Sequence, residues 1–191
     1  MRRIVLTGGP GAGKTVLCDL IPSRYPDRFA AVPEAATQIY QRFQTRWDRL
    51  DTEGRRAVQR QIYQLQVEQE SRAARTYPGK VLLLDRGTVD GAAYWPDGPD
   101  DYWRALDIER AEELARYDAV IWMQSCAAVG AYDGDATNPT RFEDAAQALL
   151  CGEALHAVWK DHPCLLTIDA CPTLDEKARR VEATLRDLSA L

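Results

Sequence analysis

Eight residues near the start of the chain have the types and spacing to bind a polyphosphate. The pattern G-x-x-x-x-G-K-[ST] is filled by Gly8-Gly9-Pro10-Gly11-Ala12-Gly13-Lys14-Thr15. Glycines let a row of backbone N–H groups point at an anion, and the positive end of a following helix adds to the attraction. The lysine reaches the β- and γ-phosphates, and the threonine hydroxyl is a ligand for Mg²⁺. We therefore expect ATP and Mg²⁺ to bind here, through Gly9, Gly11, Ala12, Gly13, Lys14, Thr15 and Val16.

Two carboxylates follow apolar runs that read as strands. The run 29–33 leads into Glu34, and the run 80–85 ends in Asp85, directly before Arg86. Parallel strands end at the edge of the sheet where ligands bind, so both acids should lie beside the phosphates. We expect Asp85 to share Mg²⁺ with Thr15. A carboxylate on the neighbouring strand could take the proton of an attacking hydroxyl, although Glu34 could instead only stabilise the start of a helix.

The elements that must position these residues alternate along the chain. Strand-like runs are separated by helical stretches, which predicts a parallel sheet covered on both faces. A long helix is expected at 52–76, with Val58, Ile62, Leu65 and Ala73 on its core-facing stripe, and a last helix at 174–188. The segment 97–101, rich in Pro, Gly and Asp, is expected to be a loop. The five predicted strands are 3–7, 29–33, 80–85, 119–123 and 164–168.

Length and composition exclude several classes of protein. The 191 residues suit one domain over 1–191, and the net charge of −5 argues against a nucleic acid as general partner. Five scattered cysteines without a C-x-x-C pair indicate reduced thiols and a cytoplasmic protein. No apolar run approaches the ~20 residues of a membrane span. The sequence does not specify an oligomeric state.

Four blocks together resemble the AAA_28 group of P-loop proteins, which includes the kinase domain of the NadR nicotinamide riboside kinase and the TTD14-like proteins. They are T-G-G-P-G-A-G-K-T at 7–15, V-P-E-A-A at 32–36, L-D-R-G-T-V-D-G-A-A-Y at 84–94 and N-P-T-R-F-E at 138–143. The P-E and D-R pairs are also similar to signatures of deoxynucleoside and thymidylate kinases. The resemblance implies a three-layer α/β/α sandwich with a five-stranded parallel sheet of order 2-3-1-4-5. It also implies a short lid at about residues 130–143.

The same resemblance implies roles for individual residues. Glu34 would activate the acceptor hydroxyl, and Arg86 would bind near that hydroxyl or the transferred phosphate. Asp85 would hold Mg²⁺ or serve as the base in place of Glu34. Asp90 and Tyr94 would border the acceptor pocket. The implied catalytic residues are Glu34, Asp85, Arg86, Lys14 and Arg141, and Arg141 and Pro172 would also contact the nucleotide.

The sequence before Arg141 also supports a catalytic role for it, because a turn-rich stretch is typical of a loop that closes over a site. An arginine on such a loop can neutralise the charge of a phosphoryl group during its transfer. The other interpretation is a surface arginine paired with a nearby acid. Pro172, in the loop after the last strand, is assigned to the nucleotide base by the resemblance alone.

Other polar and aromatic residues leave alternatives open. Gln69 falls on the apolar stripe of the long helix, so it either bonds within the core or contacts the acceptor, and we count it among the acceptor residues. The other glutamines of that helix read as a solvated face: Gln59, Gln61, Gln64 and Gln66. Trp47, Trp95 and Trp103 are either core residues or an aromatic wall for a ring-bearing substrate.

Two functions therefore compete. The first is a small-molecule kinase that phosphorylates a hydroxyl of a nucleoside-like or other small acceptor. The second is a nucleotide-dependent ATPase or GTPase regulator, or a lipid-associated switch, without an acceptor. Two carboxylates converging on the phosphates favour the kinase, because hydrolysis needs only one acid and a water. A GTPase would show an N-K-x-D guanine reader on the fourth strand, which residues 121–124 do not offer.

Overall fold

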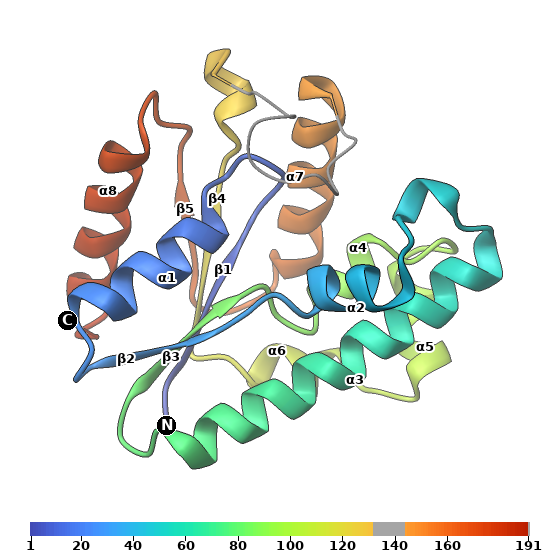
Figure 1. Cartoon of the computed structure of the whole chain (residues 1–191), viewed down its shortest axis with the longest axis horizontal. Coiled ribbons are helices and arrows are strands. Elements are labelled where there is room, and N and C mark those ends of the chain that lie inside the picture. The colour runs from blue at the N-terminus through green and yellow to red at the C-terminus, as the bar shows by residue number, and fades with distance from the viewer. Residues whose placement is uncertain (132–143, 191) are drawn as a thin grey trace.

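The structure, a computed structural model of the whole chain, describes residues 1–131 and 144–190 (Figure 1). Its sheet has five parallel strands in the order β2-β3-β1-β4-β5, which confirms the expected α/β/α architecture and strand order. The predicted strand positions are correct to within one residue at each end. The strands are β1 (Arg3–Thr7), β2 (Phe29–Val32), β3 (Val81–Asp85), β4 (Ala119–Met123) and β5 (Leu165–Ile168).

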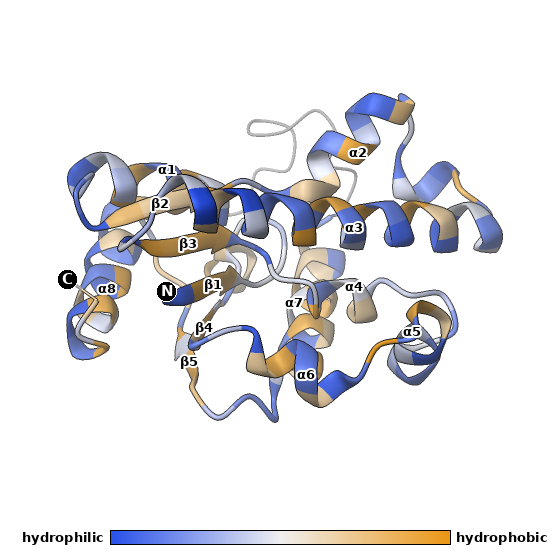
Figure 2. Ribbon diagram, turned by 90° about the horizontal axis from the view of Figure 1, so that it is seen from below, coloured by the Kyte–Doolittle hydropathy of each residue, from blue (hydrophilic) through white to orange (hydrophobic). Residues whose placement is uncertain are grey.

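The strands are apolar on both faces because helices cover both. All residues of β4 are buried, as are four of the five residues of β3. Such continuous burial is typical of parallel strands in a layered α/β fold. On one side of the sheet lie α1 (Lys14–Arg24) and α8 (Leu174–Asp187) (Figures 1 and 2). On the other side lie α3 (Thr52–Thr76), α4 (Asp90–Ala93), α5 (Pro99–Leu106), α6 (Arg110–Ala115) and α7 (Ala145–Trp159).

The strand register brings the predicted site residues to one edge. In β3, Leu84 pairs with Val32 of β2, and Asp85 pairs with Leu6 of β1. The carboxyl ends of these three strands are therefore level, and the segments that follow them leave the sheet side by side. Two short elements continue from β2 toward α3, namely α2 (Ala35–Phe43) and the 3₁₀ turn η1 (Trp47–Arg49). A second 3₁₀ turn, η2 (Cys126–Val129), follows β4.

The expectation of a loop at 97–101 is wrong in its second half. Helix α5 begins at Pro99, after Gly98 with a φ of 86°. Proline suits the first position of a helix because its fixed φ is already helical and its missing N–H is not needed there. Asp100 and Asp101 in the first turn favour the positive end of the helix dipole. Residues that usually mark a loop therefore mark a helix start here.

Helix α3 has the expected bounds but not the expected face. Asp51 caps it, because its Oδ1 accepts a 2.8 Å hydrogen bond from the Gly54 N–H. Figure 2 shows α3 hydrophilic along most of its length. Gln61 and Gln64 are exposed as predicted, but the prediction of a solvated face is wrong for Gln59 and Gln66. The buried residues of α3 are largely polar: Val58, Gln59, Gln66, Gln69, Glu70 and Ala73. Of the predicted stripe, Val58 and Ala73 are buried as expected, whereas Ile62 and Leu65 are only partly buried.

Helix α7 packs directly on the loop between β1 and α1. A Cβ on Gly9 would lie 2.3 Å from the carbonyl oxygen of Ala148 and 3.1 Å from the backbone nitrogen of Gly152. Only a residue without a side chain permits this approach of two backbones. Within the described residues, each helix is too short or too polar to span a bilayer.

Replacing Gly9 by alanine should therefore destabilise the fold. We expect Gly9→Ala to lower the free energy of unfolding by about 1–3 kcal/mol, because α7 must move away from the loop. The matched control is Gly152→Ala, whose Cβ would make ordinary contacts of 3.6–3.9 Å and would favour the helix. Urea unfolding followed by circular dichroism measures both. Equal stability of Gly9→Ala and the parent would contradict the close packing.

Candidate active site

The loop after β1 is shaped to hold an anion. Gly8 has a φ of 135°, and a Cβ there would lie 2.1 Å from the carbonyl oxygen of Met123. Gly13, with a φ of 87°, is the N-cap of α1 and provides no side-chain cap for it. The first N–H groups of a helix have no partner within the helix, so a helix that starts without a capping side chain presents them to a ligand. The geometry matches the predicted phosphate-binding loop.

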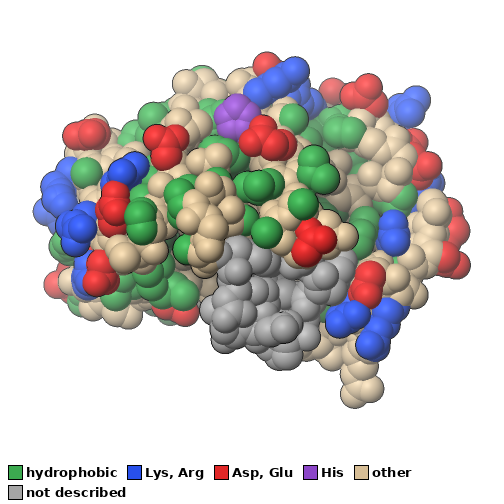
Figure 3. Space-filling model, turned by 90° about the horizontal axis from the view of Figure 1, so that it is seen from above, with side chains coloured by type: hydrophobic (Ala, Val, Ile, Leu, Met, Phe, Trp, Pro, Cys, Tyr) green, Lys and Arg blue, Asp and Glu red, His purple; other side chains and the backbone are tan. Residues whose placement is uncertain are grey.

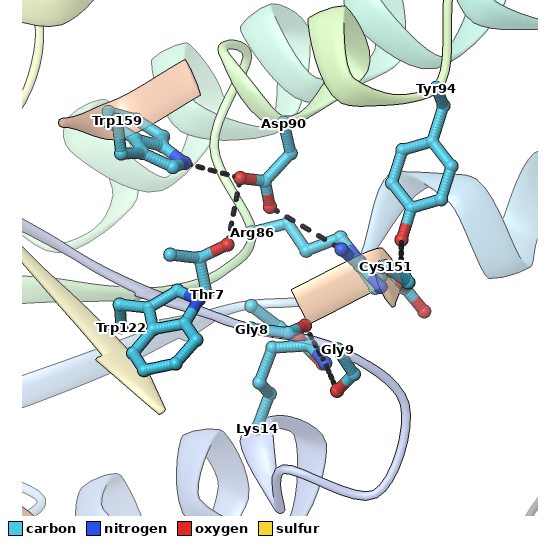
Figure 4. A network of polar contacts seen from close by, with 12 residues as sticks. Thr7, Gly8, Gly9, Lys14, Arg86, Asp90, Tyr94, Trp122, Cys151 and Trp159 are labelled. Carbon is cyan, nitrogen blue, oxygen red and sulfur yellow. Dashed lines mark hydrogen bonds and ion pairs between the residues drawn. The ribbon is translucent and has the colours of Figure 1, made fainter. Parts of the chain in front are cut away.

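Lys14 lies inside this loop. Its Nζ donates hydrogen bonds to the carbonyl oxygens of Gly8, at 2.8 Å, and Gly9, at 3.0 Å (Figure 4). The residue is only 6% exposed. Burial, followed by the nearby Arg86 guanidinium, lowers the pKa of Lys14 to about 8. Its ammonium group is thus held by two weak neutral partners, and an incoming polyphosphate would provide a stronger one.

Thr15 and Asp85 fit a magnesium ion. The Thr15 hydroxyl donates a 2.6 Å hydrogen bond to Oδ2 of Asp85. Oδ1 of Asp85 is buried and has no hydrogen-bond partner among the described residues. Burial, and then the charge of Glu34, raise the pKa of Asp85 to about 6. A bound cation would stabilise this carboxylate, and hydroxyl and carboxylate oxygens are the ligands that Mg²⁺ prefers.

Glu34 forms an ion pair with Arg86. The guanidinium Nε of Arg86 donates a 2.5 Å hydrogen bond to Oε1 of Glu34, and the Thr37 hydroxyl donates one of 2.6 Å to Oε2. Burial alone would raise the pKa of Glu34, but Arg86, the Thr37 hydroxyl and Lys14 together lower it below its usual value. The carboxylate is therefore ionised at neutral pH.

Asp90 faces the same arginine from α4. Its Oδ2 lies 3.6 Å from Nη1 of Arg86, and its Oδ1 accepts hydrogen bonds from the Thr7 hydroxyl, at 2.8 Å, and the Trp159 indole (Figure 4). The Arg86 guanidinium also lies 5.4 Å from the centre of the Tyr94 ring. Two carboxylates and an aromatic face thus surround one buried cation.

The backbone of Arg86 is held as tightly as its side chain. The residue has a φ of 77°, which costs energy for any residue other than glycine. Its N–H donates to the carbonyl oxygen of Leu6 at 3.1 Å, and its carbonyl oxygen accepts from Nε2 of Gln66 at 3.3 Å. Gln66 also bonds Glu70, at 3.1 Å. These partners on β1 and α3 keep the turn that aims the guanidinium at Glu34.

Glu70 connects this turn to the segment that follows α6 (Arg110–Ala115). The residue is fully buried and accepts hydrogen bonds from Tyr117, at 2.8 Å, and Arg116, at 2.6 Å. Tyr117 in turn accepts a 2.8 Å bond from the N–H of Thr88, two residues after Arg86. Sequence reasoning missed Gln66 and Glu70, whose i, i+4 spacing on a helix was the one signal available.

A cavity of about 570 Å³ opens in front of these charged groups. This volume is within the range of small-molecule sites. At one end it is lined by Lys14, Thr15, Glu34 and Arg86. Its lining also includes five aromatic side chains, namely Tyr40, Trp47, Tyr63, Tyr94 and Tyr102. Cys151 of α7 also lines it, with its Sγ 3.0 Å from the Tyr94 hydroxyl.

The structure brings most of the sequence-predicted residues together, with clear exceptions. Asp90 and Tyr94 line the cavity, and Trp47 does so while Trp95 and Trp103 are in the core. Gly9, Gly11, Ala12, Gly13 and Val16 form the loop and the first turn of α1, where Val16 is half-exposed. Gln69 is buried but is not among the lining residues; Gln59 and Gln66 are. The predicted acceptor contact of Gln69 therefore has no support.

Of the two further nucleotide contacts predicted, only Pro172 lies in the described part of the chain. Pro172 is exposed in the segment between β5 and α8, and it is not among the lining residues. Arg141 and residues 132–143 of the expected lid lie outside the described part of the chain.

Sequence comparison agrees with this geometry. Residues 3–177 match the AAA_28 family, which is described as an AAA domain. The match covers the phosphate-binding loop, all five strands and every residue that lines the cavity. No curated protein matches the sequence.

Removing the charge of Asp85 should separate metal binding from nucleotide binding. We expect Asp85→Asn to reduce the Mg²⁺-dependent gain in ATP affinity by about tenfold or more, the scale of a lost charge-assisted contact. Affinity in EDTA should stay within about threefold of the parent, because the amide keeps the shape and can still accept from Thr15. Fluorescence titration with a labelled ATP analogue measures both values.

The control for this measurement is Asp27→Asn, which changes an exposed aspartate after α1. If Asp85→Asn and Asp27→Asn both respond to Mg²⁺ like the parent, Asp85 is a structural residue and not a metal ligand.

Proposed function

The chain belongs to the AAA_28 family of P-loop AAA domains, and we propose that this nucleotide-binding protein is a small-molecule kinase. It would transfer the γ-phosphoryl group of ATP to a hydroxyl of a nucleoside-like or other small acceptor. One observation carries the proposal: an ionised glutamate, Glu34, lines a cavity of about 570 Å³ together with Lys14 and Thr15 of the phosphate-binding loop. Hydrolysis needs only a water molecule, so a cavity of this size beside the phosphate-binding loop favours a small-molecule acceptor.

The residues of the candidate site divide into two groups. One group would hold the phosphates, and the other would hold the acceptor. The loop N–H groups and Lys14 would bind the β- and γ-phosphates, since both are placed for an anion. Thr15 and Asp85 would hold Mg²⁺, which neutralises negative charge on those phosphates. The Arg86 guanidinium, already oriented by Glu34 and Asp90, would align the acceptor hydroxyl or the transferred group.

Glu34 would act as the general base. Its carboxylate takes the proton of the acceptor hydroxyl as the oxygen forms a bond to the γ-phosphorus, and the bond from that phosphorus to the bridging oxygen breaks to release ADP. Both oxygens of Glu34 accept hydrogen bonds from Arg86 and Thr37, yet each carboxylate oxygen has a second lone pair for the hydroxyl. Asp85 is bonded to Thr15 and fits the metal, which favours Glu34 as the base.

We expect the partner of this protein to be a small-molecule acceptor. We expect the reaction to take place in the cytoplasm. On the face in Figure 3, basic and acidic side chains are interspersed, and no continuous basic surface suited to a nucleic acid appears among the side chains drawn in colour. All five cysteines are free thiols, which suits a reducing compartment. Arg141 and Pro172 remain our candidates for further contacts to the phosphates and the base.

The charge of Glu34 provides the test that separates a kinase from a switch. Glu34→Gln keeps the shape and an oxygen for Arg86, so ATP affinity should stay close to that of the parent. Phosphoryl transfer should fall by about 10²–10⁴-fold, the usual contribution of a general base. The parent is first screened with nucleosides, vitamins and aminoglycoside-like alcohols for an ATP-dependent mass gain of one phosphate, and the variant is then assayed with the acceptor found.

The control is Glu68→Gln, an equivalent change on the exposed face of α3. Thermal unfolding of both variants shows whether loss of the Arg86 ion pair, and not loss of the base, explains a lower rate. Transfer by Glu34→Gln at the parental rate would exclude Glu34 as the base. A parent that binds ATP but phosphorylates no acceptor, with a nucleotide affinity that changes in Glu34→Gln, would favour the alternative of a nucleotide-dependent switch.

A further inference from the structure

A second, smaller cavity shares one wall with the candidate site. Its volume is about 320 Å³, at the lower end of the range of small-molecule sites. Three residues line both cavities and so form the shared wall, namely Trp47, Tyr94 and Cys151. The Tyr94 hydroxyl and the Cys151 Sγ lie 3.0 Å apart, which joins the end of α4 to α7 within this wall (Figure 4).

The second cavity does not include the groups that would carry out phosphoryl transfer. No residue of the phosphate-binding loop lines it, and neither does Glu34 or Arg86. A molecule bound in it would be separated from the phosphates by the shared wall. The second cavity is therefore a possible binding site in its own right, with a ligand that does not react there.

Aromatic rings form much of the lining of the second cavity. Trp47, Tyr94 and Trp95 all contribute to it. The ring centres of Trp47 and Tyr94 are 6.1 Å apart and their planes meet at 72°, so the two rings do not stack face to face. Aromatic side chains in such an arrangement favour a flat apolar ring as the ligand.

Arg55 supplies the one charged side chain of this lining among the described residues. Its guanidinium lies 4.7 Å from the centre of the Trp47 ring, and its Nε donates a 3.0 Å hydrogen bond to the carbonyl oxygen of Leu50. Its other N–H groups have no acceptor, and no carboxylate pairs with them, in the part of the chain that the structure describes. A guanidinium held flat on an indole, with N–H groups to spare, suits a planar carboxylate.

Two further arginines of α3 lie beside the same rings. The guanidinium groups of Arg56 and Arg60 are each 5.4 Å from the centre of the Trp95 ring. Arg56 pairs with Asp97, at 2.6 Å, and Asp101, at 2.7 Å, whereas Arg60 forms no ion pair with a described residue. Nearby acids therefore already have a partner in Arg56, and the charge inside the lining is positive. This charge favours an anion as the ligand.

We propose that the second cavity binds a flat aromatic carboxylate. The ring of the ligand packs against Trp47 and Trp95, and its carboxylate accepts two parallel hydrogen bonds from the Arg55 guanidinium. The proposal goes beyond the proposed kinase function and does not depend on it. The bound ligand also touches, from the other side, the wall that Trp47 and Tyr94 present to the candidate site.

Naphthalene-2-carboxylate and naphthalene-2-carboxamide are a matched pair of probes, because they share their rings and differ in the negative charge. Binding of each probe to the full chain is measured by ligand-observed NMR titration at constant ionic strength. We expect a dissociation constant of about 1 mM or tighter for the carboxylate, which is typical of a ligand of this size. The carboxamide should bind about tenfold more weakly, because it lacks the charge that Arg55 recognises.

Two variants locate the probe, each with a matched control. Arg55→Gln should weaken carboxylate binding about tenfold, whereas Arg49→Gln, which removes an exposed arginine of η1 outside the lining, should not. Ala154→Phe fills the second cavity from an exposed position that does not line the larger one, and should weaken binding of both probes about tenfold or more. Its control is Ala157→Phe, an exposed position about one turn further along α7 that lines neither cavity.

The candidate site is the competing location, because Lys14 and Arg86 could also attract the carboxylate there. Carboxylate binding that is unchanged in either Arg55→Gln or Ala154→Phe would overturn the proposal, and so would equal affinities for the two probes or no binding at all. Displacement of the carboxylate by a non-hydrolysable ATP analogue with Mg²⁺ would overturn it as well, since the phosphates lie beyond the shared wall. Circular dichroism of each variant shows that it is folded.

Discussion

The buried guanidinium of Arg86 is the feature on which the rest of the site depends. A charge taken out of water is stable only with charged and hydrogen-bonding partners around it. Glu34 supplies a direct hydrogen bond from the segment after β2, and Asp90 supplies a second negative charge from α4. Since Gln66 holds the backbone of the same residue, Arg86 joins the segments that follow β2 and β3 to α3 and α4. The charged end of the cavity is therefore already formed in the protein alone, which reduces what a substrate must organise on binding.

Much of this arrangement follows from local sequence patterns. The glycine loop needs specific φ angles and a close backbone approach, so its residue types reveal it directly. The strands are apolar runs, and their parallel order places Glu34 and Asp85 at one edge without any knowledge of their contacts. The match to the AAA_28 family confirms the resemblance that these blocks suggested. The roles assigned to the individual site residues stay predictions.

The buried face of α3 could not be predicted from local sequence patterns in the same way. An apolar stripe was expected to face the core, but α3 packs with Gln66 and Glu70 against buried hydrogen-bonding groups on other segments. A glutamine in a sequence has the same identity whether it faces water or a buried partner, and Arg116 and Tyr117 are distant along the chain. The spacing of apolar residues therefore could not predict this polar face, because that pattern counts only apolar residues. Gln69 was assigned to the acceptor because it falls on the predicted apolar stripe, whereas the glutamines that line the cavity are Gln59 and Gln66.

The contact between Gly9 and α7 has a consequence for how this sequence can change. Since no side chain fits between the loop and the backbone at Ala148, any change at position 9 must be accompanied by a shift of α7. Position 9 is therefore restricted to glycine by a helix that lies far along the chain. Mutational libraries aimed at new nucleotide or acceptor preferences should keep glycine at position 9, and diversity is better placed on the α3 side of the cavity.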